Sequence, residues 1–225
     1  MARKKIVFVI VEGPSDEEAL DAVISKLFDV NTVYVHIMHG DVTTMNLPRN
    51  SNVVSKIGDE IRHYAKSNHF DKTDFKEIIH IVDTDGAYIP DENIHEDVTL
   101  NEVVYSEADI RAKSKRNIEN RNSRKRDSLN RLSSLKKIWN VPYQVFYMSC
   151  NLDHVLYNKL NSTDEEKERD AFMFAKKYKS VPEEFKRFIC KSEFSVMTGY
   201  KESWNYIKQD LHSLERHTNL GLCFE

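Results

Sequence analysis

The sequence predicts an α/β fold in which helices flank a mainly parallel β-sheet. Four short runs of apolar, β-branched residues alternate with segments that have the spacing of amphipathic helices. This alternation is typical of βαβ units, whose strands pair in parallel. The composition supports a folded core, because 40% of the 225 residues are hydrophobic and Gly and Pro are few. We therefore expect one large domain, or one domain with a helical addition.

The first half of the chain contains three predicted strands and two predicted helices. Lys5–Val11 is almost wholly apolar, which indicates a strand covered on both faces. Ser15 and Glu18 have the spacing of a capping box, so the first helix is expected to begin at Ser15. The other predicted elements, separated by a polar loop through Ser51, are strands at Val33–Met38 and Ile78–Val82 and a helix at Val53–Ala65.

The second half begins with a segment of unclear periodicity, residues 87–109, which we expect to be a loop. Residues 110–139 lack Gly and Pro and predict a polar, basic helical insertion. Its sparse leucines lie near the C-terminal end, so only that end is expected to pack firmly. The remaining predicted elements are a strand at Val141–Met148 and helices at Asn151–Leu160, Glu165–Tyr178, Pro182–Ile189 and Lys201–Leu214.

Several classes of protein do not fit this sequence. The N-terminal apolar run, Ile6–Val11, is too short for a signal peptide or a membrane-spanning helix, so we expect a cytoplasmic protein with no membrane partner. The three cysteines are far apart and have no CxxC spacing, which argues against a disulfide framework and against a zinc site.

The net charge of −3 conceals two blocks of opposite charge. Residues 83–109 contain nine acids and no Lys or Arg, whereas residues 111–137 contain eleven Lys or Arg and two acids. The basic block could contact a phosphate backbone, or it could be the solvated face of a helix. The candidate nucleic-acid contacts are Arg111, Lys113, Lys115, Arg116, Arg121, Arg124, Lys125 and Arg126.

Two groups of carboxylates directly follow predicted buried strands. Glu12 follows the first strand, and Asp83 and Asp85 follow the third. Ligands of open α/β sheets bind outside the carboxyl ends of the strands, so these side chains are expected to share one crevice. Converging carboxylates repel one another unless a cation compensates them, and their oxygens suit Mg²⁺ or Mn²⁺. The Asp-Thr-Asp-Gly segment could also be a plain turn.

These residues bring the chain close to a known family. The string VFVIVEGPSDEEAL resembles the first TOPRIM motif, and IIHIVDTDG resembles the second. Asp16, and Asp153 within SCNLDHVLYN, lie at positions that resemble those of acidic residues in the OLD-family and RloB-like nucleases. The resemblance covers roughly residues 4 to 160, weakly between 87 and 140. It implies a TOPRIM catalytic domain over residues 1–160, completed by a C-terminal helical region over residues 161–225.

The resemblance implies a Mg²⁺-dependent nuclease of DNA or RNA, with Mn²⁺ as a substitute ion. Glu12, Asp83 and Asp85 would be catalytic, and the implied metal ligands are Glu12, Asp16, Asp83, Asp85 and Asp153. Glu12 could instead act as a general acid or base. The family also uses a downstream lysine, for which Lys191 and Lys201 are candidates. Phage-defence or mobile-element biology is associated with this fold.

Some alternatives stay open at this point. Full-length OLD proteins carry an ATPase domain, but this sequence has no GxxxxGK[ST] phosphate loop, so a separate ATPase subunit could be a partner. A homo-oligomer is equally compatible with the sequence. The alternative to an enzyme is a non-catalytic TOPRIM-like module that binds nucleic acid or serves as a sensor or partner subunit.

Overall fold

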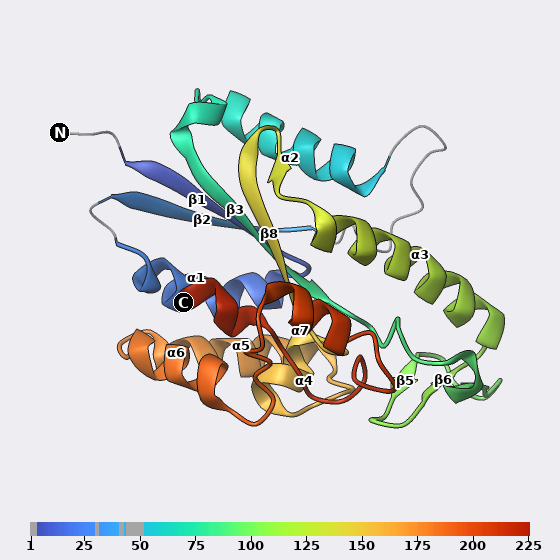
Figure 1. Ribbon diagram of the computed structural model, residues 1–225. Coiled ribbons are helices and arrows are strands. Elements are labelled where there is room, and N and C mark those ends of the chain that lie inside the picture. The colour runs from blue at the N-terminus through green and yellow to red at the C-terminus, as the bar shows by residue number, and fades with distance from the viewer. Residues whose placement is uncertain (1–3, 30–31, 41–42, 44–51) are drawn as a thin grey trace.

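Four parallel strands form the centre of the molecule, in a computed structural model that describes residues 4–29, 32–40, 43 and 52–225. The strand order is β2 (Val33–His39), β1 (Lys5–Val11), β3 (Phe75–Asp83) and β8 (Val141–Met148), with a short antiparallel strand, β7 (Lys137–Ile138), beside β8. Figure 1 shows this sheet with helices on both sides. The predicted α/β fold with a mainly parallel sheet is therefore confirmed.

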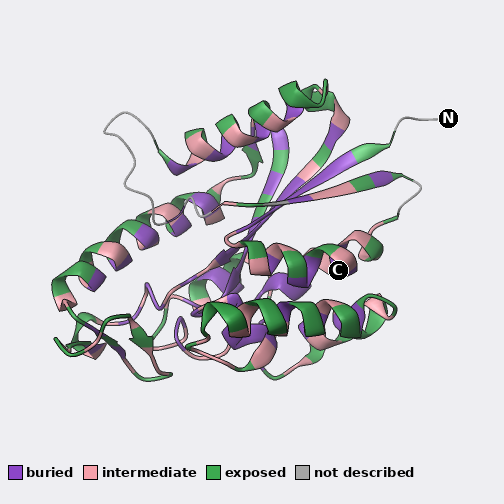
Figure 2. Ribbon diagram, turned by 180° about the vertical axis from the view of Figure 1, so that it is seen from behind, coloured by how far each residue is buried: buried purple, intermediate pink, exposed green. Residues whose placement is uncertain are grey.

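The side chains of β1, β3 and β8 enter two separate cores. One core lies under α1 (Pro14–Leu27), α5 (Asp164–Tyr178) and α6 (Pro182–Lys191), and the other lies under α2 (Val53–Ser67) and α3 (Lys115–Ser134). Because successive side chains of a strand point to opposite faces, β1 contributes to both cores. Figure 2 shows the inner strands β1, β3 and β8 largely buried between helices whose outward faces are exposed. The side chains from β1 are Val7, Val9 and Val11 in the first core and Ile6, Phe8 and Ile10 in the second.

The first helix begins before the residue that capping-box spacing predicts. Gly13 is the N-cap residue and Pro14 is the first helical residue, a position that tolerates a proline because its missing N–H needs no partner there. Asp16 then accepts a hydrogen bond from the backbone N–H of Gly13 at 2.9 Å. The Ser15 and Glu18 capping box is thus wrong, and Asp16 has the stabilising role instead.

The segment expected to be a loop, residues 87–109, contributes to a small second sheet. Its strands are β4 (Ile94–Glu96), β6 (Ile110–Ala112) and β5 (Val104–Tyr105), in that order across the sheet. Ile94 and Ile110 are completely buried in a third apolar cluster. Strands of two or three residues are too short to produce a visible period in the sequence, which explains why they were not predicted.

Helix α3 packs along its whole length, not only at its C-terminal end as the sequence suggested. Its buried residues recur at steps of three or four, which is the spacing of one helix face. Two of them are polar, because the middle of the helix faces the turn after β3 and not an apolar core. The buried residues are Ile118, Asn122, Lys125, Leu129 and Leu132.

The C-terminal residues close the free edge of β8. Helix α7 spans Tyr200–Tyr206, so the helix predicted to continue to Leu214 is shorter and turns follow it. The Trp204 indole donates to the carbonyl of Val145 at 3.3 Å, and the Tyr200 hydroxyl accepts from the N–H of Val145 at 3.2 Å. These side chains satisfy edge groups that would otherwise template a further strand.

The other elements are short. Helix α4 spans Leu152–Tyr157, and single 3-10 turns occur at Lys72–Asp74, Asp91–Asn93 and Leu220–Phe224. The polar loop expected through Ser51 lies mostly outside the described residues. Within the described residues, no helix is long and apolar enough to cross a membrane.

A buried threonine ties the end of β3 to the C-terminal segment. The Thr84 hydroxyl donates to the carbonyl of Ser213 at 2.8 Å and accepts from the N–H of Cys150 at 2.8 Å. We expect Thr84→Val to lower the free energy of unfolding by about 1–2 kcal/mol, because a buried carbonyl loses a donor. Urea denaturation measures this change. Thr198→Val, at an exposed threonine, should alter stability by less than about 0.5 kcal/mol, and equal effects would contradict the assignment.

Candidate functional site

The predicted carboxylates lie where the strand order reverses. After β1 the chain adds β2 on one side, and it then returns to place β3 on the other side of β1. Glu12 directly follows β1 and Asp83 ends β3, so both lie at the carboxyl ends of neighbouring parallel strands. This topological switch point is the usual ligand crevice of an open α/β sheet.

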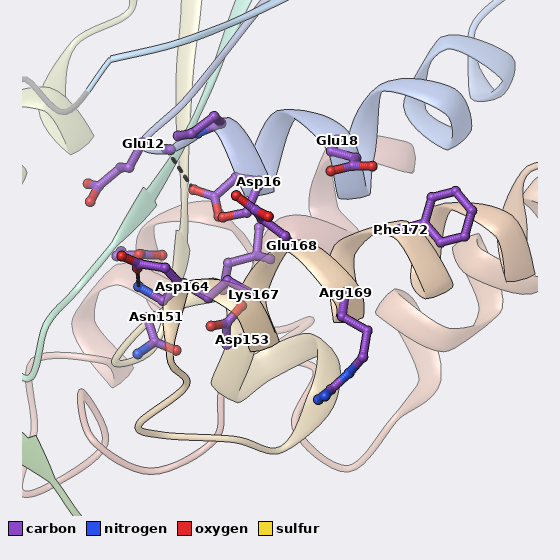
Figure 3. A pocket seen from close by; sticks show the side chains of 15 residues that line it. Glu12, Asp16, Glu18, Asn151, Asp153, Asp164, Lys167, Glu168, Arg169 and Phe172 are labelled. Carbon is purple, nitrogen blue, oxygen red and sulfur yellow. Dashed lines mark hydrogen bonds and ion pairs between the residues drawn. The ribbon is translucent and has the colours of Figure 1, made fainter.

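A cleft of about 940 Å³ opens at this point between α1, α4 and α5. Four of the five predicted metal ligands line it, namely Glu12, Asp16, Asp83 and Asp153, and Figure 3 shows three of them. Asp85 does not line the cleft. Seven of the fifteen lining residues are acidic and only two, Lys167 and Arg169, are basic. The cleft is therefore strongly negative, as the paired motifs suggested.

Asp16 is held in place at the first turn of α1 and is 9% exposed. Burial raises its pKa to about 6, the hydrogen bond from Gly13 opposes this shift, and the nearby charge of Asp153 adds to it. Asp153 lies on α4 and is 5% exposed, and burial raises the pKa of its carboxyl as well. Both carboxylates are thus costly to ionise in the absence of a compensating cation.

The pKa of the Asp83 carboxyl is raised more strongly than that of Asp16 or Asp153. Burial raises its pKa well above the usual range, and the charges of Glu12, Asp16 and Asp85 raise it further. Lys125 opposes the shift. The carboxylates of the two motifs therefore interact electrostatically, in agreement with the place of Glu12, Asp16 and Asp83 on one cleft.

A lysine that the sequence placed on an exposed basic surface is instead the internal counter-ion of the site. The Lys125 side chain is fully buried, and its Nζ lies 3.3 and 3.4 Å from the two carboxylate oxygens of Glu12 and also contacts Asp85. Burial alone would lower the pKa of Lys125, but the attraction of Asp85, Glu12 and Asp83 raises it above its ordinary value. Glu12 also accepts a hydrogen bond from the Thr43 hydroxyl at 3.0 Å.

Helix α3 also fixes the turn that carries Asp85. Arg121 donates to the carbonyl of Asp85 at 2.8 Å, and Arg126 donates to the carbonyl of Ala87 at 3.1 Å. Asp85 and Gly86 both have positive φ, of 49° and 64°. A Cβ at Gly86 would lie 2.6 Å from Leu214, so glycine is required both by conformation and by space.

The eight basic residues proposed to contact nucleic acid have different surroundings. Three of them make internal contacts with Glu12 or with the turn after β3, namely Lys125, Arg121 and Arg126. Lys115 donates to the carbonyl of Asp91 at 2.7 Å, and Arg111 is paired with Asp109 at 3.1 Å. The residues that are exposed and have no carboxylate partner in the described part of the chain are Lys113, Arg116 and Arg124.

The two lysines considered for a catalytic role do not reach the acidic cleft. Lys191 is the last residue of α6 and Lys201 lies on α7, and neither lines the cleft. Lys167 is the lysine that lines the cleft, near Asp16 and Asp153. Lys125 instead contacts Glu12 and Asp85. Its place on the buried face of α3, four residues before Leu129, is the signal that could have found it.

The side chains of Glu12, Asp16, Asp83 and Asp153 suit a hard divalent cation, because they offer carboxylate oxygens. Burial, and the charges of neighbouring carboxylates, raise the pKa of Asp83 and of Asp16, and a bound cation would favour their ionised forms. Among the described residues, however, no three His, Cys, Asp or Glu side chains are already arranged around one ion position. The residues therefore fit Mg²⁺ by chemistry and charge, and side-chain rotation would be needed to complete its coordination.

Comparisons of the chain with protein-family models, with curated proteins and with solved structures find no match.

The buried position of Lys125 makes it essential to the stability of the site. We expect Lys125→Met to lower the free energy of unfolding at pH 7 by about 3 kcal/mol, because it leaves Glu12 and Asp85 without their shared cation. Arg124→Met removes the neighbouring but exposed cation and should change stability by less than about 0.5 kcal/mol. Chemical denaturation of both variants tests this contrast, which fails if the two losses are equal.

Proposed function

We propose that the chain is a TOPRIM-type, metal-dependent nuclease that cleaves phosphodiester bonds in DNA or RNA. The observation that supports it best is the convergence of Glu12, Asp16, Asp83 and Asp153 on one cleft at the switch point of a parallel sheet. The raised pKa values of Asp16, Asp83 and Asp153 favour a site that works with a bound cation. The resemblance to OLD-family and RloB-like nucleases adds a reaction class to this geometry, with phage-defence or mobile-element biology as an association of fold.

In this proposal Glu12, Asp16, Asp83 and Asp153 hold Mg²⁺, with Mn²⁺ as a substitute. The bound ion would polarise a scissile phosphate and lower the pKa of an attacking water. Asp85 acts differently from the sequence-based expectation, because its contact with Lys125 makes it a partner of the internal counter-ion. Lys125 pairs with Glu12, and Arg121 holds the turn that carries Asp85.

A polyanionic substrate would meet strong repulsion from the acidic cleft alone. The exposed cations of the basic segment, Lys113, Arg116 and Arg124, could offset this repulsion by contacting phosphates on either side of the cleavage site. Such contacts would position nucleic acid without reading its sequence.

A second candidate is a non-catalytic module that binds nucleic acid or a partner such as a separate ATPase subunit. It is favoured by one observation, namely that no three metal-binding side chains of the described residues surround a single ion position. In that case the Lys125 cluster would serve stability alone.

Substitutions of two carboxylates separate the candidates. Glu12→Gln and Asp83→Asn should each reduce Mg²⁺-dependent cleavage by roughly a hundredfold or more, because each removes a charged oxygen ligand. Glu18→Gln removes an acid that lines the same cleft without being a proposed ligand, and it should retain activity within about threefold. Cleavage of single-stranded DNA, double-stranded DNA and RNA is measured with Mg²⁺ and with Mn²⁺. Absence of cleavage of all three by the wild-type protein would favour the non-catalytic module.

Removal of two exposed cations tests the nucleic-acid surface. In the Arg116→Gln/Arg124→Gln variant, the slope of log affinity against log salt for duplex DNA should become shallower by roughly 1 to 2, because each lost phosphate contact releases about 0.9 counterion less. Lys66→Gln/Lys72→Gln makes the same charge change at exposed positions near the opposite end of the sheet and should leave the slope unchanged. Equal changes in both variants would indicate only the loss of net charge.

A further inference from the structure

A second cleft, of about 680 Å³, lies apart from the acidic site. Its floor is formed by Ile78 of β3 and Tyr143 of β8, and its walls are the C-terminal end of α3 and α7. Ile78 and Asp83 are separated by five residues of extended strand, which corresponds to about 16 Å. The two clefts are thus distinct and share no lining residue.

Three aromatic residues held in fixed positions line this second cleft, with Tyr200 half-buried and Tyr143 and Trp204 almost wholly buried behind the lining. Tyr200 and Trp204 both hydrogen-bond to the backbone of Val145, at 3.2 and 3.3 Å. The Trp204 ring also packs edge-on against Tyr147, with 5.2 Å between ring centroids. Tyr143 completes the aromatic lining. The Tyr200 ring, which is half-buried and fixed by its hydrogen bond, would lose little entropy when a ligand contacts it, and this favours binding.

The charge of the second cleft is positive, in contrast to the acidic site. Lys136, Lys201 and Lys208 line it, and Glu77 is its only acid. Glu77 already contacts Lys76 at 3.2 Å, whereas neither Lys136 nor Lys201 has a carboxylate partner in the described part of the chain. Burial lowers the pKa of Lys208, so an anion beside it would offset an unfavourable environment.

We propose that this cleft is a binding site for a small anion that carries an aromatic ring, of the mononucleotide class. Its volume lies within the range of about 300–1,000 Å³ that small-ligand pockets occupy. The lysines supply charge-assisted hydrogen bonds to phosphate, and the aromatic and aliphatic walls contact the ring. The amide and hydroxyl side chains of Asn130, Ser133 and Asn205 can bond to the edge of a base. The site is independent of the proposed nuclease reaction.

Calorimetric titration of the full chain tests the site with three probes, namely adenosine monophosphate, adenosine and inorganic phosphate. EDTA is included so that no divalent cation bridges a phosphate to the acidic cleft. We expect saturable binding of the monophosphate, at least about tenfold tighter than that of either fragment. Only the whole ligand contacts the apolar lining and the lysines of the cleft together.

Two adjacent lysines provide a matched comparison. Lys136→Gln removes a cation that lines the cleft and should weaken binding of the monophosphate by about tenfold, the effect of losing one charge-assisted hydrogen bond. Lys137→Gln makes the same change at an exposed neighbour that does not line the cleft, and it should leave the affinity unchanged. Lys201→Gln on α7 should repeat the loss from the opposite wall.

Several results would overturn the proposal. The first is that the monophosphate shows no saturable binding up to about 1 mM, the weak end of ligand affinities. The second is that phosphate alone binds as tightly as the monophosphate. The third is that Lys136→Gln and Lys137→Gln lose equal affinity for the monophosphate. Binding that is abolished by Asp83→Asn but not by Lys201→Gln would place the ligand in the acidic cleft and also contradict the assignment. None of these results depends on whether the protein cleaves nucleic acid.

Discussion

The contact of Lys125 with Glu12 and Asp85 is the constraint on which the rest of the site depends. A fully buried ammonium is tolerated only when carboxylates surround it, and carboxylates this close together need a cation between them. The pairing therefore couples the end of β1, the turn after β3 and the middle of α3. It also explains why a helix of such polar composition packs along its whole length. The same carboxylate, Glu12, is a proposed metal ligand, so the lysine and a metal ion would share its charge.

Much of the fold could be predicted from the sequence, and so could the carboxylates of the candidate site but not its buried lysine. The four parallel strands were evident because each is a short apolar run, and the ends of parallel strands necessarily share one edge of the sheet. This is why Glu12 and Asp83 were expected together and why the structure places them together. The role of Lys125 could not be read from local charge, because the same basic segment contains exposed and buried cations. Only the face of α3 that packs distinguishes Lys125 from Arg124.

The errors at the C-terminal end have a tertiary cause. Trp204, Ile207 and Leu211 have helical spacing, yet the chain turns after Tyr206. The turns bring Leu214 against Gly86 and the carbonyl of Ser213 to Thr84. Packing against the turn after β3 thus overrides local propensity. The same segment, through α7, also forms one wall of the second cleft, so the C-terminal region contributes to both ends of the sheet.

The bond from Thr84 to Ser213 joins residues 129 positions apart, and this separation sets the order of assembly. A chain made from its N-terminus exposes all four parallel strands well before residue 213 has been synthesised. Contacts between distant parts of a chain form late, because loop closure must precede them. The turn with Asp85 and Gly86 therefore acquires its final support only after residues 213 and 214 have been synthesised. Until residue 213 is available, the turn after β3 lacks the bond from Thr84 to the carbonyl of Ser213.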